Sequence, residues 1–227
     1  MTAPWWARST AAVVFGGIWP TRVHGAEAVP ATGGVLFASN HLGFLDGPLL
    51  VGVAPRWVHC LVKSELFHGP VGAVLRAAGQ IPVQRASVDR SALDTAAQIL
   101  RDGGAVGVFP EGARGRGDVG EVRLGIAWLA LRAGVPVVPV ACLGTRLTGE
   151  STHGLPMPRR RLDVVFGAPV SLEQPPGTSR RAALEAAGAA LQGALAAHVR
   201  HAIDLTGQAL PVDLGWSAEE IARGEHL

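Results

Sequence analysis

The residues best suited to chemistry in this sequence are His41 and Asp46, which lie five positions apart with Gly43 between them. On a continuous helix this spacing would place the side chains roughly 140° apart, so they can meet only through a turn. A carboxylate that meets an imidazole holds the ring in one tautomer and lets it act as a general base. From these residues alone a structural alternative stays open, with Asp46 as a helix N-cap and His41 as a satisfied residue at a strand end.

A glycine-rich loop with two arginines, FPEGARGRGD at residues 109–118, contains the next candidates, Glu111, Gly112 and Arg114. Such a loop can present backbone N–H groups and guanidinium groups to a phosphate with little steric obstruction. A solvated surface loop is the alternative. Because the loop leaves directly from an apolar run expected to be a buried strand, a shaped binding site is favoured.

Two further basic residues, Lys63 and Arg85, each come just after an apolar run. Open α/β sheets gather ligand groups at such strand ends, although surface charge explains either residue taken singly. The sequence contains no H-E-x-x-H, C-x-x-C, Walker or G-x-S-x-G motif. A base beside several anion-binding groups therefore predicts group transfer to or from a phosphorylated substrate, with no metal or organic cofactor.

The scaffold for these residues is expected to be α/β, because strand-like runs alternate with helix-length segments. We predict a single domain with a mixed, largely parallel sheet flanked by helices. The expected strands are 21–24, 35–39, 57–63, 80–84, 105–109, 135–142 and 162–166. The expected helices are 47–53, 65–78, 89–101, 122–133 and 179–201.

The segment 135–142 is apolar on both faces, as in a central strand, yet it contains Pro136 and Pro139. Proline is disfavoured inside a ladder, so an irregular or edge-like path is expected there. Cys60 and Cys142 are the two cysteines, and both lie in apolar runs. They predict buried thiols in a reducing compartment and no disulfide framework.

The length and net charge of the chain exclude further classes of function. A chain of 227 residues can bury one full core, and its formal net charge of +2 excludes a strongly basic nucleic-acid footprint. The hydrophobic fraction of 48% favours a membrane-facing surface. The expected organisation is an N-terminal interfacial helix at 1–20, a main domain at 21–204, and a tail at 205–227 with a short helix begun by the capping box at 217–220.

The N-terminal segment has a short apolar run at 11–19, too short to span a bilayer, flanked by Trp5, Trp6 and Trp19. This pattern is typical of a helix that lies in the membrane interface, and a core-packing helix is the related alternative. A signal peptide is disfavoured, since the segment has little positive charge and is broken by glycines and Pro20. We expect peripheral attachment at the cytoplasmic face of a membrane.

Four sequence blocks occur in order over roughly residues 20–170 and together resemble the glycerolipid acyltransferase family of the 1-acylglycerol-3-phosphate acyltransferase type. The first block, N-H-x-x-x-x-D, is matched by Asn40, His41 and Asp46, and the second by Lys63, Glu65, Leu66, Phe67, Gly79, Ile81, Val83 and Arg85. The third block resembles F-P-E-G-T-R-S and is matched by Phe109, Pro110, Glu111, Gly112 and Arg114, with Ala113 and Gly115 in place of Thr and Ser. The fourth is matched by Val135 to Val140, and Arg123-Leu124-Gly125 matches a K-x-G element.

The resemblance implies the glycerol-3-phosphate acyltransferase-like fold and a role for each matched residue. His41 would deprotonate the acceptor hydroxyl while Asp46 orients the imidazole. Arg85, Glu111, Gly112 and Arg114 would bind the glycerol phosphate, with Lys63 near the same anion, and Pro139 would help shape an acyl tunnel or the site wall. The resemblance also implies three partners: an acyl-CoA or acyl-carrier protein donor, a glycerophosphate-type lipid acceptor and a membrane surface.

The hydroxyl lost at Ala113 puts the acceptor head group in doubt, because it removes one donor near the expected phosphate. Three alternatives remain at this point: an acyltransferase acting on another lysolipid or lipid head group, a thioesterase, and a lipid-binding module on the same fold.

Overall fold

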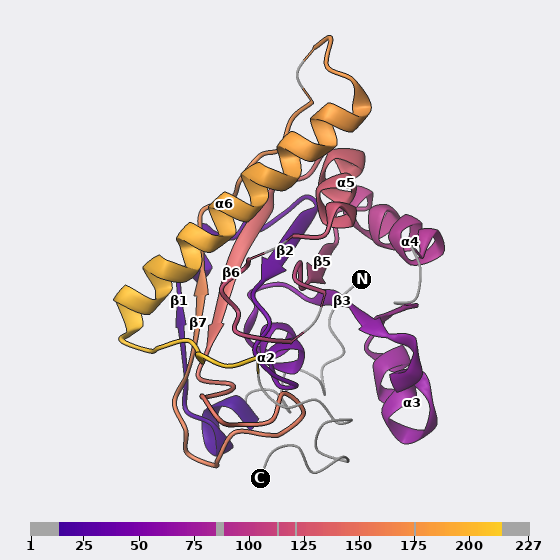
Figure 1. The fold of residues 1–227 in the computed structure, drawn as a ribbon. Helices are drawn as coiled ribbons and strands as arrows, with labels where there is room; N and C mark the ends of the chain where they lie inside the picture. The colour runs from indigo at the N-terminus through magenta and orange to yellow at the C-terminus, as the bar shows by residue number, and fades with distance from the viewer. Residues whose placement is uncertain (1–13, 85–88, 113, 121, 175, 215–227) are drawn as a thin grey trace.

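The computed structural model describes residues 14–84, 89–112, 114–120, 122–174 and 176–214 of the chain. Within this part seven strands form one sheet in the order β1-β7-β6-β2-β5-β3-β4 (Figure 1). Strands β6 and β7 pair antiparallel and all other neighbours pair parallel, so β1 and β7 run opposite to the other five. The strands are β1 (Thr21–His24), β2 (Val35–Ser39), β3 (Val58–Lys63), β4 (Ile81–Val83), β5 (Ala105–Val108), β6 (Val137–Leu143) and β7 (Leu162–Phe166). The predicted α/β class with a mixed, largely parallel sheet is confirmed.

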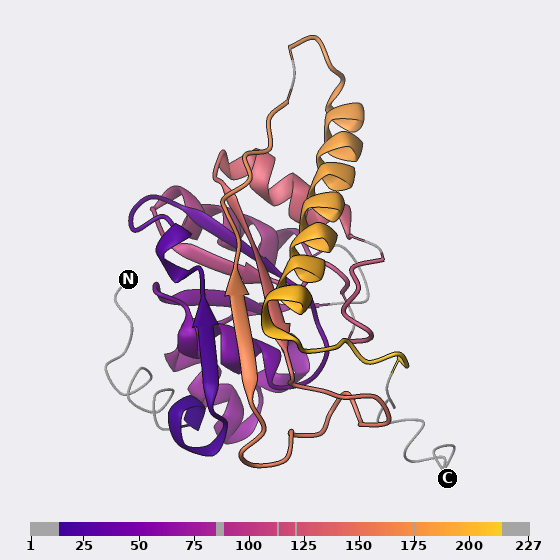
Figure 2. The same cartoon turned by 90° about the vertical axis from the view of Figure 1, so that its left-hand side faces the viewer.

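Helices cover both faces of this sheet, which explains why the central strands β2, β5 and β6 are buried at every residue. On one face α4, α5 and α6 pack against residues such as Leu36 and Ala38; on the other, α2 and η1 pack against residues such as Val35 and Phe37 (Figure 2). The helices are η1 (Val14–Ile18), η2 (Ala26–Ala28), α2 (Asp46–Val53), η3 (Ser64–Phe67), α3 (Gly69–Ala77), α4 (Arg90–Arg101), α5 (Leu124–Ala133) and α6 (Arg180–Thr206).

The helix predicted at 65–78 is divided into η3 and α3. The break comes at His68, which is extended, and Gly69, whose φ is 60°. Pro70 follows in the first turn of α3. Proline is favoured there and disfavours helical backbone in the residue before it, so a new helix starts where the sequence pattern suggested one continuous helix.

The expectation of an irregular or edge-like path at 135–142 is wrong. Strand β6 lies between β7 and β2, and its seven residues are all buried. Pro136 precedes the strand, and Pro139 sits one residue before Val140, where the antiparallel ladder with β7 begins. The carbonyl of Pro139 accepts a hydrogen bond of 2.8 Å from Gly167. The missing proline N–H therefore falls at the end of that ladder, where it removes little pairing.

Of the predicted N-terminal interfacial helix, the structure describes only residues from 14 onward, so Trp5 and Trp6 lie outside it. Phe15 and Trp19 are buried in the core beside α2, and the indole of Trp19 donates to the carbonyl of Pro156 at 3.0 Å. Trp19 therefore packs into the core of the domain. No helix in the described ranges is both long and apolar enough to cross a membrane.

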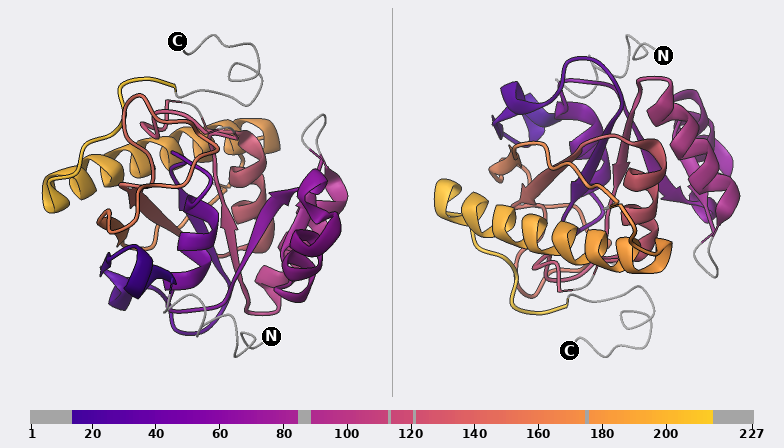
Figure 3. Two further views of the ribbon diagram at one scale, coloured as in Figure 1. Left: turned by 90° about the horizontal axis from the view of Figure 1, so that it is seen from below. Right: turned by 90° about the horizontal axis from the view of Figure 1, so that it is seen from above.

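At the other end, α6 continues to Thr206, five residues beyond its predicted end, and stops at Gly207 with φ of 69°. After α6 the chain runs back beside the loop that follows β6 (Figure 3). Gln208 donates to the carbonyl of Arg161, and the N–H of Val212 donates to the hydroxyl of Thr148. The short helix expected after the capping box at 217–220 lies outside the described residues.

Candidate active site

Three loops meet where β2, β5 and β6 end, because these adjacent strands run parallel and finish at the same edge. After β2 the chain turns through residues 40–45 and enters α2 at Asp46. This turn brings Nδ1 of His41 within 2.9 Å of Oδ2 of Asp46. His41 is 5% exposed and Asp46 is fully buried. The His–Asp turn expected from the sequence is therefore present.

The carboxylate of Asp46 accepts further hydrogen bonds. Its Oδ2 also accepts from the N–H groups of Leu42 at 2.6 Å and Gly43 at 2.8 Å, and its Oδ1 accepts from the hydroxyl of Thr145 at 2.5 Å. Because an ionised carboxylate only accepts, Nδ1 of His41 is the donor and Nε2 keeps its lone pair. The N-cap alternative is wrong, since the carboxylate points back into the turn and makes no bond to the first amides of α2.

The glycine-rich loop after β5 packs against His41. The Phe109 ring stacks on the imidazole with centroids 4.2 Å apart and planes at 25°. The N–H of His41 donates to Oε1 of Glu111 at 2.8 Å, and its carbonyl accepts from the N–H of Gly115 at 2.9 Å. The histidine is thus held through its ring, its amide and its carbonyl, which limits the rotation of the proposed base.

Glu111 lies in surroundings that disfavour its charge. Burial raises the pKa of Glu111 to about 7; the His41 N–H opposes this rise, and the nearby charges of Asp118 and Asp46 add to it. Near neutral pH this carboxyl therefore exists in both protonation states. It can accept a hydrogen bond in either state and donate one when protonated.

Two glycines allow the loop to approach its neighbours closely. Gly112 has φ of 70°, and a Cβ placed on it would lie 2.0 Å from Nε of Arg123. Gly117 also has φ of 70°, and a Cβ there would lie 2.3 Å from Leu42 and 2.9 Å from Nδ2 of Asn40. The left-handed backbone favours glycine at both positions, and a side chain at either one would also displace the neighbour that packs against it.

Of the loop cations, Arg114 lies over the ring of Phe44 at 5.4 Å and donates to the carbonyl of Thr152 at 3.4 Å. Arg123, which the sequence matched to the K-x-G element, lies against Gly112 and donates its backbone N–H to the carbonyl of Pro110 at 3.0 Å. Both guanidinium groups therefore flank the loop that contains Glu111.

Arg146, which the sequence did not indicate, connects the segments that surround the site. Its guanidinium is 1% exposed and donates to the carbonyls of Leu42 at 3.1 Å and Gly115 at 2.9 Å. It also donates to both the carboxylate and the carbonyl of Asp213. One side chain thus links the His–Asp turn, the glycine-rich loop and the segment after α6. No motif signalled Arg146 or Thr145; the one available hint was their position just after a strand.

Asn40 joins the turn to β6 in a similar way. Its amide donates to the carbonyl of Cys142 at 3.1 Å and accepts from the N–H of Cys142 at 2.8 Å, which extends the pairing of the two strands by one residue. The thiols of Cys142 and Cys60 are buried, as expected, and burial raises the pKa of both, that of Cys60 to about 12. Neither thiol is suited to act as a nucleophile near neutral pH.

The structure does not bring every predicted residue to this site. Lys63 ends β3 at the same edge of the sheet, but its ammonium pairs with Glu65 at 3.2 Å, and both side chains are exposed. Arg85 lies outside the described residues. Pro139 belongs to the central strand, close to Gly167 and His198 under α6. Its role in an acyl tunnel or site wall stays a prediction.

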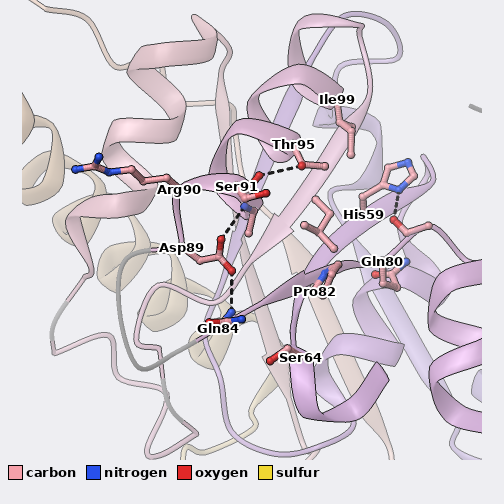
Figure 4. A pocket seen from close by; sticks show the side chains of 13 residues that line it. His59, Ser64, Gln80, Pro82, Gln84, Asp89, Arg90, Ser91, Thr95 and Ile99 are labelled. Atoms are coloured by element: carbon pink, nitrogen blue, oxygen red, sulfur yellow. Dashed lines mark hydrogen bonds between the residues drawn. The ribbon is translucent and has the colours of Figure 1, made fainter. Parts of the chain in front are cut away.

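A pocket of about 690 Å³ lies elsewhere, between the edge strand β4 and α4 (Figure 4). Its lining includes His59, Ser64, Gln84 and Asp89, and none of the described candidate residues. The pocket is on the α4 side of the sheet, whereas Phe109, which stacks on His41, packs against the α2 side. The pocket and the His41–Asp46 pair are therefore separate. Among the described residues no group of three or more His, Cys, Asp or Glu side chains could hold a metal ion.

Comparisons with known proteins point to one family. The Acyltransferase family model matches residues 20–143, more than half of the chain. A 1-acyl-sn-glycerol-3-phosphate acyltransferase of Bacillus subtilis is 34% identical over 125 residues, which cover 54% of this chain and 62% of the relative. A protein of the same name from Borreliella burgdorferi is 32% identical over 127 residues, covering 54% of this chain and 51% of the relative.

A solved structure has the same fold. The 1-acyl-sn-glycerophosphate (LPA) acyltransferase, PlsC, from Thermotoga maritima gives a TM-score of 0.66 at 23% identity and covers 87% of this chain and 78% of its own. The matches to the two curated relatives span about half to three-fifths of their length.

Proposed function

Because the chain belongs to the Acyltransferase family, we propose that it moves a fatty acyl group from a thioester donor to the free hydroxyl of a lysoglycerophosphate. The proposed acceptor is 1-acylglycerol-3-phosphate and the product phosphatidate, as the names of the curated relatives suggest. The proposed donor is acyl-CoA or acyl-carrier protein. The observation that supports this most is the 2.9 Å contact between His41 and Asp46 at an edge lined by arginines and glycines.

In the proposed mechanism Nε2 of His41 removes the proton from the acceptor hydroxyl as its oxygen attacks the thioester carbonyl. Asp46 holds Nδ1 and stabilises the imidazolium that forms. The tetrahedral intermediate collapses with cleavage of the C–S bond, and the imidazolium returns the proton to the leaving thiolate. The products are the new ester and the free thiol. General-base assistance of this kind contributes roughly 10²–10⁴-fold to the rate.

The same proposal assigns binding roles around the base. Glu111, Gly112 and Arg114 would contact the glycerol phosphate, since they lie in the loop that packs on His41. Arg85 and Lys63 would add positive charge at the neighbouring strand ends. Pro139, which pairs with Ala38 in the strand beside the turn, would help shape an acyl tunnel or the site wall.

A direct test incubates the purified full chain with lysophosphatidate and acyl-CoA and measures phosphatidate by mass spectrometry and free thiol with a thiol-reactive dye. We expect equal amounts of phosphatidate and thiol, and a loss of roughly 10²–10⁴-fold in the His41→Ala variant. Thiol release without phosphatidate would indicate hydrolysis or another acceptor. Full transfer by His41→Ala would contradict the mechanism.

Peripheral attachment to the cytoplasmic face of a membrane is a separate part of the proposal, supported by Trp5 and Trp6 beside the short apolar run near the N-terminus. Since Phe15 and Trp19 belong to the core, removal of residues 1–20 would also disturb packing. The sharper test replaces Trp5 and Trp6 by alanine and measures co-sedimentation with vesicles that contain anionic lipid. We expect weaker binding, and unchanged binding would contradict this part.

A further inference from the structure

Thr145 follows β6 and is 2% exposed, and its hydroxyl donates a hydrogen bond of 2.5 Å to Oδ1 of Asp46. We infer that Thr145 is a positioning residue for acyl transfer, acting on His41 through Asp46. The inference rests on the proposed function and deepens it. Thr145 lies two residues beyond the segment 20–143 that the family model matches, so the match itself says nothing about this residue.

The two oxygens of Asp46 are held from different parts of the chain. Oδ2 accepts from His41, Leu42 and Gly43, all within the turn itself. Oδ1 accepts from Thr145, which is 99 residues away on the chain. The three donors on Oδ2 restrain the carboxylate from one side, but the terminal torsion of aspartate has a broad energy minimum, so small rotations of its plane remain possible. The hydrogen bond from Thr145 to Oδ1 holds the other side and limits these rotations.

The direction of the imidazole depends on the same plane. Nδ1 of His41 donates to Oδ2, so a tilt of the carboxylate also tilts the ring and moves Nε2 away from the acceptor hydroxyl. Displacements of about 1 Å in such arrangements can lower a rate by about 100-fold. The hydroxyl of Thr145 is buried against Asp46, so its loss should lower kcat and leave KM nearly unchanged.

The first experiment compares Thr145→Val, which keeps the shape and loses the hydroxyl, with Thr145→Ser, which keeps the hydroxyl. The matched control is Thr206→Val, which loses a hydroxyl that donates to the carbonyl of Ala202 at the end of α6. We expect Thr145→Val to lower kcat roughly ten- to hundredfold. Thr145→Ser should keep a kcat within about threefold of the wild-type value, and Thr206→Val should have the kcat of the wild type. Melting curves of all variants establish that they are folded.

The second experiment does not depend on turnover. A proton shared between an imidazole and a carboxylate appears far downfield in proton NMR, and its absence in His41→Ala assigns it to the pair. We expect Thr145→Ser to retain this signal and Thr145→Val to shift or broaden it. If the wild type showed the signal but no acyl transfer, the proposed function would fail while the effect of Thr145 on the pair could still be judged.

Three outcomes would overturn the inference. One is a Thr145→Val variant with the kcat of the wild type. Another is a Thr145→Ser variant as slow as Thr145→Val, which would assign the effect to packing and not to the hydroxyl. The last is a downfield signal that Thr145→Val leaves unchanged.

Discussion

Arg146 and Asp213 form an ion pair of 2.5 Å in which the guanidinium side chain is 1% exposed and the carboxylate side chain 35% exposed. A second contact joins the same guanidinium to the backbone carbonyl of Asp213. Through this pair the segment after α6 is fastened to the loops that surround His41. The candidate site is therefore completed by residues far beyond the sequence motifs.

Asp213→Ala should destabilise the protein, because it leaves a buried guanidinium without its carboxylate. We expect a loss of about 1–3 kcal/mol in the free energy of unfolding, measured by urea denaturation, together with lower acyl transfer because Leu42 and Gly115 lose part of their anchor. Glu185→Ala is the control, since it removes an exposed pair with Arg181 and should change stability by less than about 0.5 kcal/mol. Equal effects of the two substitutions would contradict the role of the buried pair.

Asp46→Asn should reduce activity more than its small change in shape suggests. The carboxylate accepts four hydrogen bonds, whereas an amide offers one acceptor oxygen and turns an NH₂ group toward one set of donors. We expect the rate of acyl transfer to fall by roughly 10²–10⁴-fold, because His41 loses the partner that fixes its tautomer. Steady-state kinetics measure the effect. Asp102→Asn, at an exposed helix end, should be neutral, and near-wild-type activity of Asp46→Asn would contradict the role of Asp46.

The raised pKa of Glu111 predicts that the stability of the folded protein depends on pH. The folded chain holds the proton of this carboxyl up to about pH 7, whereas the unfolded chain releases it near the ordinary pKa of 4.5. The folded state therefore binds more protons between these values, and this contribution to stability is lost as the pH rises from about 4.5 to about 7. The Glu111→Gln variant has no carboxyl at this position, so its stability does not fall for this reason as the pH rises.

Urea denaturation of the wild type and Glu111→Gln at pH 5 and pH 8 tests this dependence. Because other titrating groups are common to both proteins, the difference between them isolates Glu111. We expect the variant to gain about 1–3 kcal/mol relative to the wild type between the two pH values, after allowance for the partial exposure of the group. Parallel stability curves would contradict the raised pKa.

Gly117 and Gly33 separate the effect of a close contact from that of backbone strain. Both have positive φ, 70° and 76°, but an added Cβ meets Leu42 and Asn40 only at Gly117 and finds nothing within 4 Å at Gly33. Gly33→Ala should destabilise by about 1 kcal/mol through strain alone. Gly117→Ala should cost about 1–3 kcal/mol more by overpacking and should also lower acyl transfer. Equal stability and full activity in both variants would contradict the close packing at Gly117.

The sequence by itself determined where most strands and long helices lie and which turn pairs His41 with Asp46. Three strands, β1, β2 and β7, have the predicted bounds, because runs of β-branched residues between glycine, proline and charged residues are local signals. Because only a short loop separates His41 from Asp46, local sequence also determines their contact. The order of the motifs was enough to indicate an acyltransferase.

Tertiary structure decided which distant residues complete the site. Thr145 and Arg146 reach the turn from 99 and 104 residues away, and Asp213 reaches Arg146 across a further 67. It also decided that β6 is central despite Pro139, since the place of a missing N–H in a ladder depends on the neighbouring strand. Such contacts arise only when β2, β5 and β6 lie side by side, because no local pattern of side chains records which strand becomes the neighbour of another.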